Sequence, residues 1–127
     1  MKVYIAGKVN GLEVSEIASQ IEDLGHEITY KWWEGEKLQR PYLDNLRVFE
    51  VNEGCRQGVY DADSVIIFSH VNGKGLYYEL GYVTSLIEHN DKDVKIYHIG
   101  DCDLSTFLND RNITQVSNLE ELLEIIK

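Results

Sequence analysis

The sequence predicts an α/β fold, a three-layer sandwich with a mainly parallel sheet of about five strands, Rossmann/flavodoxin-like in kind. Short apolar runs alternate along the chain with segments whose apolar residues recur at the helical period. The strand-like runs are apolar almost throughout, which is typical of strands covered by helices on both faces. A chain of 127 residues without an internal repeat or linker is expected to form one domain over residues 1–127.

The first part of the chain predicts a strand, a helix and a second strand. KVYIA at 2–6 has the pattern of a buried strand, and the segment 13–25 has one apolar helical face and ends at Gly25, a residue that commonly terminates helices. HEITYKW at 26–32 alternates like a second strand. The period is then lost around the only proline, Pro41, which predicts a long loop or a short irregular helix.

The second part of the chain repeats the alternation. Its SVIIFSH run is the most strongly strand-like in the protein, and segments of helical period flank it. The expected elements are a helix at 45–60, a strand at 64–70, a helix at about 75–88, a strand at 94–100, a short helix near 103–110, a short strand at 113–116 and a final helix from Asn118.

Composition and charge narrow the classes of partner. The formal net charge of −10, with no cluster of Lys or Arg to offset it, would repel duplex nucleic acid, whereas a small nucleotide held by backbone N–H groups stays possible. No apolar run approaches the ~20 residues that cross a bilayer, and the start of the chain lacks the pattern of a signal peptide. We therefore expect a cytoplasmic protein without a membrane partner, whose Cys55 and Cys102 are reduced.

Glycine-rich loops are expected at the ligand-binding edge of the sheet. In parallel sheets the ligand lies beyond the carboxyl ends of the strands. AGKVNG follows the first strand and HVNGKG follows the SVIIFSH strand, so their backbone N–H groups, with a positive helix end, could face a phosphate or carboxylate. The spacing matches neither a dinucleotide fingerprint nor a P-loop, and ordinary tight turns are the alternative.

The stretch GKGLYYELGY adds an acid to this edge. Glu79 lies four residues beyond Gly75, in the first turn or so of its helix, where the helix dipole favours an ionised carboxylate. Such a carboxylate can act as a nucleophile or stabilise a sugar cation. The alternative is that Glu79 only complements the charge of the helix end.

Three segments resemble the nucleoside 2-deoxyribosyltransferase superfamily, which includes the deoxynucleoside 5′-monophosphate N-glycosidases and small uncharacterised relatives. They are AGKVNG after the first strand, CRQGVYDAD leading into SVIIFS, and GKGLYYELGY, in the order and spacing of that superfamily over roughly the first 100 residues. The resemblance implies cleavage or exchange of the N-glycosidic bond of a nucleoside or nucleotide, with Glu79 as nucleophile and Tyr4 positioning it. It also implies a homodimer or higher homo-oligomer.

Two positions depart from the pattern of that superfamily. The aspartate that assists protonation of the leaving base aligns with Cys55, and an acidic or serine position six residues before the nucleophile aligns with Gly73. A positioned proton donor contributes about 10²- to 10⁴-fold to such a reaction, so the loss of the acid is serious. The alternatives are a non-catalytic nucleotide-binding or sensing protein and a structural domain without a ligand.

The remaining candidate residues complete a predicted substrate site. Of the adjacent tryptophans Trp32 and Trp33, one is expected to pack inward and the other, taken to be Trp33, to stack on a base. The four histidines are scattered without ligand spacing, so neither a metal nor a cofactor is expected. The predicted substrate-binding residues are Gly7, Lys8, Asn10, Gly11, Trp33, Cys55, Gly73, Lys74 and Gly75, with Lys8 and Lys74 as partners for a phosphate.

Overall fold

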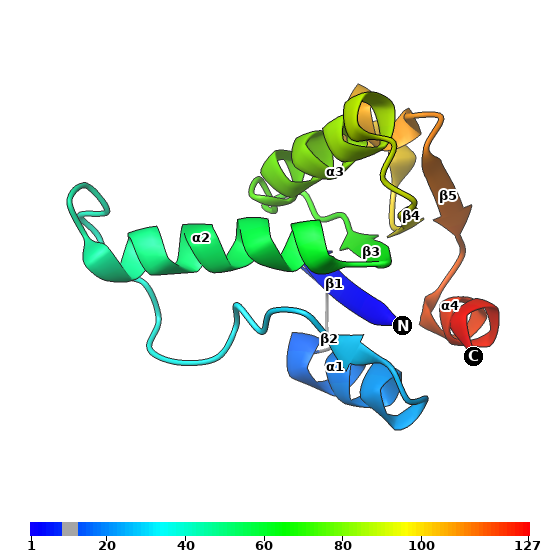
Figure 1. Cartoon of the computed structure of the whole chain (residues 1–127), viewed down its shortest axis with the longest axis horizontal. Helices are drawn as coiled ribbons and strands as arrows, with labels where there is room; N and C mark the ends of the chain where they lie inside the picture. Colours follow the sequence, from blue (N-terminus) through cyan, green and yellow to red (C-terminus); the bar gives the residue numbers. More distant parts are fainter. Residues whose placement is uncertain (9–12) are drawn as a thin grey trace.

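A five-stranded parallel sheet lies at the centre of the molecule, in the strand order β2-β1-β3-β4-β5 (Figure 1). The computed structural model describes residues 1–8 and 13–127. Each neighbouring pair of strands is parallel, which confirms the predicted α/β fold class. The strands are β1 (Lys2–Gly7), β2 (Glu27–Ile28), β3 (Ser64–Phe68), β4 (Lys95–Ile99) and β5 (Ile113–Val116).

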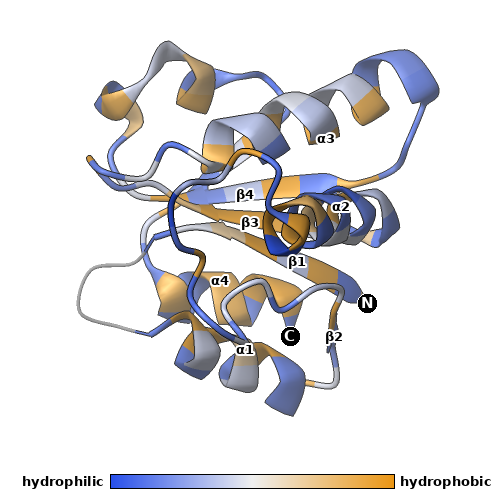
Figure 2. Ribbon diagram, turned by 90° about the vertical axis from the view of Figure 1, so that its left-hand side faces the viewer, coloured by the Kyte–Doolittle hydropathy of each residue, from blue (hydrophilic) through white to orange (hydrophobic). Residues whose placement is uncertain are grey.

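Helices cover both faces of this sheet (Figure 2). In the described ranges they are α1 (Val14–Asp23), α2 (Leu46–Asp61), α3 (Leu76–Asn90) and α4 (Leu119–Ile126), with two short 3-10 turns, η1 (Cys102–Leu104) and η2 (Thr106–Asn109). None of these helices is long and apolar enough to cross a membrane.

The core consists of two apolar layers separated by the sheet. Along β1, alternate side chains enter opposite layers, as the strand geometry requires: Tyr4 and Ala6 pack toward α2 and α3, whereas Val3 and Ile5 pack toward α1 and α4. Both sets are fully buried, which explains why the strands are apolar throughout in the sequence.

Strand order fixes where a ligand crevice can form. From β1 the chain first adds β2 on one side and then returns to place β3 on the other side, so the order of the strands reverses between β1 and β3. In open α/β sheets, ligands bind outside the carboxyl ends of the strands at this switch point. Gly7 ends β1 there, with φ +98°, and a Cβ at that position would lie 2.0 Å from the Phe68 carbonyl oxygen, so β1 and β3 converge closely.

The second strand is much shorter than predicted. The pattern at 26–32 predicts seven residues, but only Glu27–Ile28 pair with β1. The chain leaves the sheet because the Thr29 hydroxyl donates to the Gly58 carbonyl of α2 at 2.8 Å, and a turn then closes where the Glu34 N–H donates to the Lys31 carbonyl. The expected short helix near 103–110 is likewise replaced by η1 and η2.

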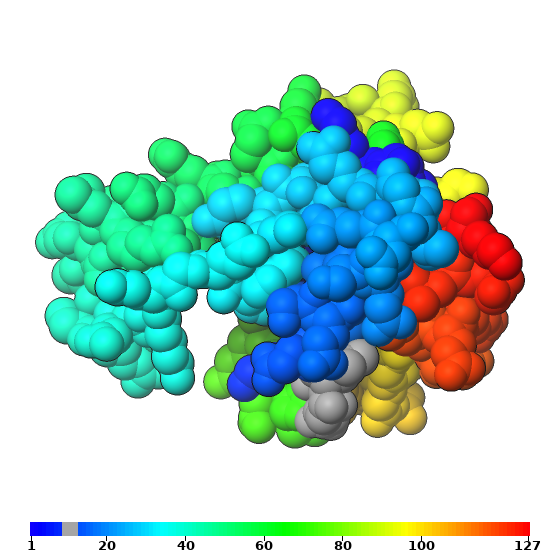
Figure 3. Space-filling model, turned by 90° about the horizontal axis from the view of Figure 1, so that it is seen from below, coloured from blue at the N-terminus to red at the C-terminus, as the bar shows by residue number. Residues whose placement is uncertain are grey.

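Helix α2 is packed closely on the sheet at one end only. A Cβ at Gly54 would lie 2.3 Å from the Tyr30 ring, so its absence allows α2 to pack on the segment after β2. A Cβ at Gly58 would lie within 3.0 Å of the Tyr4 ring, so its absence allows α2 to approach β1. The first turns of α2 and the loop before them form a lobe that projects from the body (Figure 1; cyan to teal in Figure 3). Asn45 caps this end by accepting from the Arg47 and Val48 N–H groups.

Candidate functional site

A cavity of about 300 Å³ opens at the switch point between β1 and β3. It receives side chains or backbone from the loop after β1, the segment after β2, the inner side of α2, the loop after β3 and the first turn of α3. Its lining comprises Gly7, Lys8, Trp32, Val51, Cys55, Asn72, Gly73, Lys74, Gly75, Leu76 and Glu79.

A tyrosine and a glutamate form the polar centre of this site. The Tyr4 hydroxyl, on a fully buried side chain of β1, donates to Glu79 Oε1 at 2.9 Å across 75 positions of sequence. Glu79 Oε2 is also buried, but it has no hydrogen-bond partner among the described residues. Buried carboxylate oxygens are ordinarily paired, so an oxygen without a protein partner in the wall of a cavity is an acceptor that a ligand or a water molecule can use.

Burial changes the acidity of both groups. It raises the pKa of Glu79 above the usual range, and the hydrogen bond from Tyr4 opposes that rise. It also raises the pKa of Tyr4, with the nearby Glu79 charge as the second cause, so Tyr4 remains a donor. The sequence-based expectation that the helix end favours the ionised form is therefore corrected: Glu79 does lie in the first turn of α3, but burial dominates its pKa.

Cys55 lines the cavity from α2 as a half-buried thiol. Burial raises the pKa of this thiol, and the charge of Glu79 raises it further. A thiol is a weak hydrogen-bond donor, and a raised pKa makes it a weaker acid. Cys55 therefore occupies the wall of the site without supplying the acidity of an aspartate.

The described residues of both glycine-containing loops contribute to the cavity lining. Lys8 follows Gly7 and donates its backbone N–H to the Phe68 carbonyl, while Lys74 precedes Gly75, the N-cap residue of α3. Both lysine side chains are exposed. The cavity lining therefore includes two lysines and the N-terminal end of a 15-residue helix, groups that suit an anionic ligand.

Of the two adjacent tryptophans, Trp32 lines the cavity, and the predicted Trp33 is not part of its lining. Trp32 lines the cavity and packs with the α2–α3 layer of the core, whereas Trp33 packs with the α1–α4 layer on the other side of the sheet. The prediction assumed strand geometry at 26–32, and the strand ends at Ile28.

Most of the other predicted residues meet in this cavity. Gly73, Gly75 and the residues discussed above line it, while Asn10 and Gly11 lie outside the described residues. Sequence reasoning missed Val51, Asn72 and Leu76. Asn72 lies in the glycine-rich loop and could have been found from it, but Val51 and Leu76 have the pattern of ordinary core residues.

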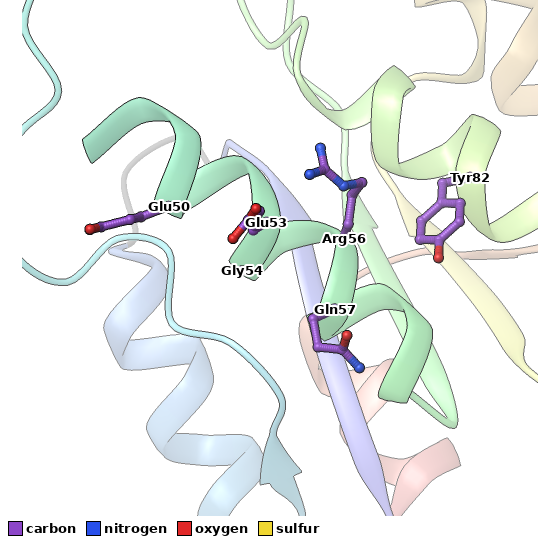
Figure 4. Close-up of a pocket in the computed structure, with 6 residues that line it drawn as sticks. All are labelled: Glu50, Glu53, Gly54, Arg56, Gln57 and Tyr82. Carbon is purple, nitrogen blue, oxygen red and sulfur yellow. The ribbon is translucent and has the colours of Figure 1, made fainter. Parts of the chain in front are cut away.

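A larger hollow, of about 670 Å³, lies on the outer side of α2 and reaches α3 (Figure 4). It is lined by Glu50, Glu53, Gly54, Arg56, Gln57 and Tyr82, none of which contacts the Tyr4–Glu79 pair by a hydrogen bond. Figure 4 shows Arg56 on the side of α2 toward α3, where its guanidinium donates to the Tyr78 hydroxyl at 3.0 Å. The chemistry therefore belongs to the smaller cavity.

Metal ligands are not grouped in either cavity over the described part of the chain. Among the described residues, no three His, Cys, Asp or Glu side chains lie together in an arrangement that could hold a metal ion.

Comparisons with known proteins identify the fold. No family model matches the chain, and no curated protein matches it. Among solved structures, CMP N-glycosidase BcmB from Clostridium botulinum superimposes with a TM-score of 0.63 and 12% identity, covering 99% of this chain and 98% of that one. A conserved protein from Enterococcus faecalis V583 gives a TM-score of 0.64 and 14% identity, covering 99% and 96%. The chain therefore shares, over its full described length, the fold of an N-glycosidase.

Proposed function

We propose that this protein cleaves or exchanges the N-glycosidic bond of a nucleoside or its 5′-monophosphate, with Glu79 as the nucleophile. The observation that carries the proposal is the Glu79 carboxylate at the cavity: one oxygen is held by Tyr4, and the other is buried without a partner among residues 1–8 and 13–127. The fold shared with a CMP N-glycosidase supports the reaction class.

The proposed reaction begins with ionised Glu79. Oε2 attacks the anomeric carbon of the sugar, the C–N bond breaks with its electron pair leaving on the base, and a glycosyl ester forms on Glu79. Tyr4 holds Oε1 throughout and so fixes which oxygen attacks. Water or a second base then displaces Glu79 from the anomeric carbon, which restores the carboxylate, and the proton that this nucleophile loses is taken up by the departed base. Lys8, Lys74 and the N-terminus of α3 would bind a 5′-phosphate.

The expected turnover is slow. Among the described residues that line the cavity, Glu79 is the one carboxylic acid, so the leaving base receives no proton from an aspartate. Burial raises the pKa of the Cys55 thiol, which therefore replaces that acid poorly. The same observation supports the second candidate function, a nucleotide-binding or sensing protein that retained the site without the chemistry.

We also propose that two or more copies of the chain associate, as the family resemblance implies, and that they do so in the cytoplasm. The projecting end of α2 supports association because Leu43 and Leu46 are 83% and 75% exposed there, and Phe49 is 48% exposed. Exposed apolar side chains gathered at one place are a feature of interaction sites. Sedimentation analysis of the wild type and of Leu46→Glu tests this association. The wild type is expected to be a dimer and Leu46→Glu a monomer, whereas a monomeric wild type would contradict the proposal.

One experiment separates catalysis from binding. The pure protein is incubated with a panel of nucleosides and 5′-monophosphates, with and without an acceptor base, and free base or new nucleoside is measured by chromatography. Turnover that disappears in Glu79→Gln and persists in Glu53→Gln, an exposed acid outside the cavity, is the expected result. Thermal stabilisation by a nucleotide without release of base would instead favour the binding protein.

A further inference from the structure

The short second strand leaves part of the β1 edge unpaired by backbone. The Thr29 N–H donates to the Val3 carbonyl at 2.9 Å, and the chain then turns away from the sheet. The next carbonyl facing that edge belongs to Ile5. It accepts from the indole Nε1–H of Trp32 at 2.7 Å, so a side chain replaces the strand that the sequence pattern predicts.

This hydrogen bond fixes the orientation of the Trp32 ring beside the cavity. The ring is partly buried against the α2–α3 core layer and meets the ring of Trp33 edge to face, with 5.5 Å between centroids and an interplanar angle of 86°. Trp33 is itself held in the opposite core layer. An aromatic ring held by two partners loses little further freedom when a ligand stacks on it.

The rest of the lining is of two chemical kinds. Val51, from α2, adds apolar surface to that of Trp32. Lys8, Lys74 and the glycines of the loop after β3 are the lining groups that favour an anion. Glu79 belongs to the same lining, with its unpaired oxygen.

We propose that Trp32 is the surface on which the nucleobase stacks and the residue that selects substrates with a planar aromatic leaving group. This inference rests on the proposed function, because it takes the ligand to be a nucleoside or nucleotide. Stacking is tolerant of base identity, since every base has a π-face. Trp32 therefore discriminates an aromatic base from an absent or aliphatic one, rather than one base from another.

The test measures binding in a Glu79→Gln background, in which bound substrate is not consumed. Calorimetric titrations use nucleoside 5′-monophosphates and, as a probe without a base, ribose 5-phosphate. Trp32→Leu is expected to weaken nucleotide binding by about 5- to 150-fold, the equivalent of about 1–3 kcal/mol per stacked base, and to leave binding of ribose 5-phosphate unchanged. Phe107→Leu, at an exposed aromatic ring outside the cavity, serves as the control and is expected to change neither.

A second variant guards against loss of folding. Trp32→Phe keeps an aromatic face but removes the donor to Ile5, and it is expected to retain most of the nucleotide affinity. Three results would overturn the proposal. Trp32→Leu could bind nucleotides as tightly as the parent, or its affinity for ribose 5-phosphate could fall as much as its affinity for nucleotides. Trp32→Phe could also bind nucleotides as weakly as Trp32→Leu does. If the wild type binds and turns over nucleotides and Trp32→Leu binds them equally well, this inference alone is refuted. If the protein binds no nucleotide at all, the proposed function is refuted together with this inference.

Discussion

Replacing Glu79 with glutamine is expected to stabilise the protein at alkaline pH and not at acid pH. Burial raises the pKa of Glu79 in the folded state above its value in the unfolded chain. Below the unfolded pKa the carboxyl is protonated in both states and contributes nothing. As pH rises from the unfolded pKa through the folded pKa, the folded state must hold a disfavoured buried charge, so stability is lost over that window.

The expected size follows from the one unpaired oxygen. Leaving a buried polar atom without a partner costs about 1–3 kcal/mol, and Oε2 has no partner in the part of the chain that the structure describes. Glutamine keeps an acceptor for the Tyr4 hydroxyl but places a neutral unpaired NH₂ at the other position, which returns part of the gain. A net gain of about 1 kcal/mol remains, or roughly 4 °C in Tm for a chain of this size.

Differential scanning calorimetry at pH 8 and pH 4 measures the effect. Glu79→Gln should raise Tm at pH 8 and leave it unchanged at pH 4, while the exposed Glu53→Gln should change little at either pH. A fall in Tm at pH 8, or an equal rise at both pH values, would show that Glu79 is an ordinary structural partner of Tyr4. The reasoning from the unpaired oxygen would then be refuted.

Three other substitutions test separate parts of the structure. Tyr4→Phe removes the hydrogen bond that lowers the pKa of Glu79, so the acid limb of a kcat/KM profile should move to higher pH; an unmoved limb would argue against Glu79 as the titrating group. Gly7→Ala should lower the free energy of unfolding by about 1–3 kcal/mol or more, because its Cβ would meet the Phe68 carbonyl at a φ of +98°. Gly81→Ala, inside α3 with open space around the added Cβ, should raise it by about 1 kcal/mol, and urea unfolding measures both.

Much of the fold could be predicted because its signals are local. The strand at Ser64–Phe68 and the helix at Val14–Asp23 are defined by their own apolar patterns, and Gly25, with φ +94°, follows α1 as expected of a terminating glycine. The second strand could not be predicted at its true length. Its alternation continues to residue 32, but the Thr29 hydroxyl finds a partner in Gly58, a contact that no local pattern encodes.

The site shows the same division. The glycine loops are visible in the sequence, and the family resemblance pairs Tyr4 with Glu79, which the hydrogen bond between them agrees with. Burial raises the pKa of Glu79, and that burial depends on the packing of α2 and α3 over β1. The position of Glu79 at the start of a helix, taken alone, predicted a lowered pKa. The choice between Trp32 and Trp33 assumed that side chains alternate between the two faces of a strand, but the second strand ends before these residues.

The indole of Trp32 also protects the sheet from other chains. An unpaired strand edge is a template on which a second extended chain can add, and proteins commonly block such edges. On β1, the backbone of β2 protects only the first residues, and the Trp32 N–H occupies the Ile5 carbonyl beyond them. Trp32→Phe frees this acceptor while keeping the aromatic surface, so it should increase the tendency of the protein to aggregate on prolonged incubation. Light scattering against wild type measures this, and equal scattering would show that the edge is shielded by other means.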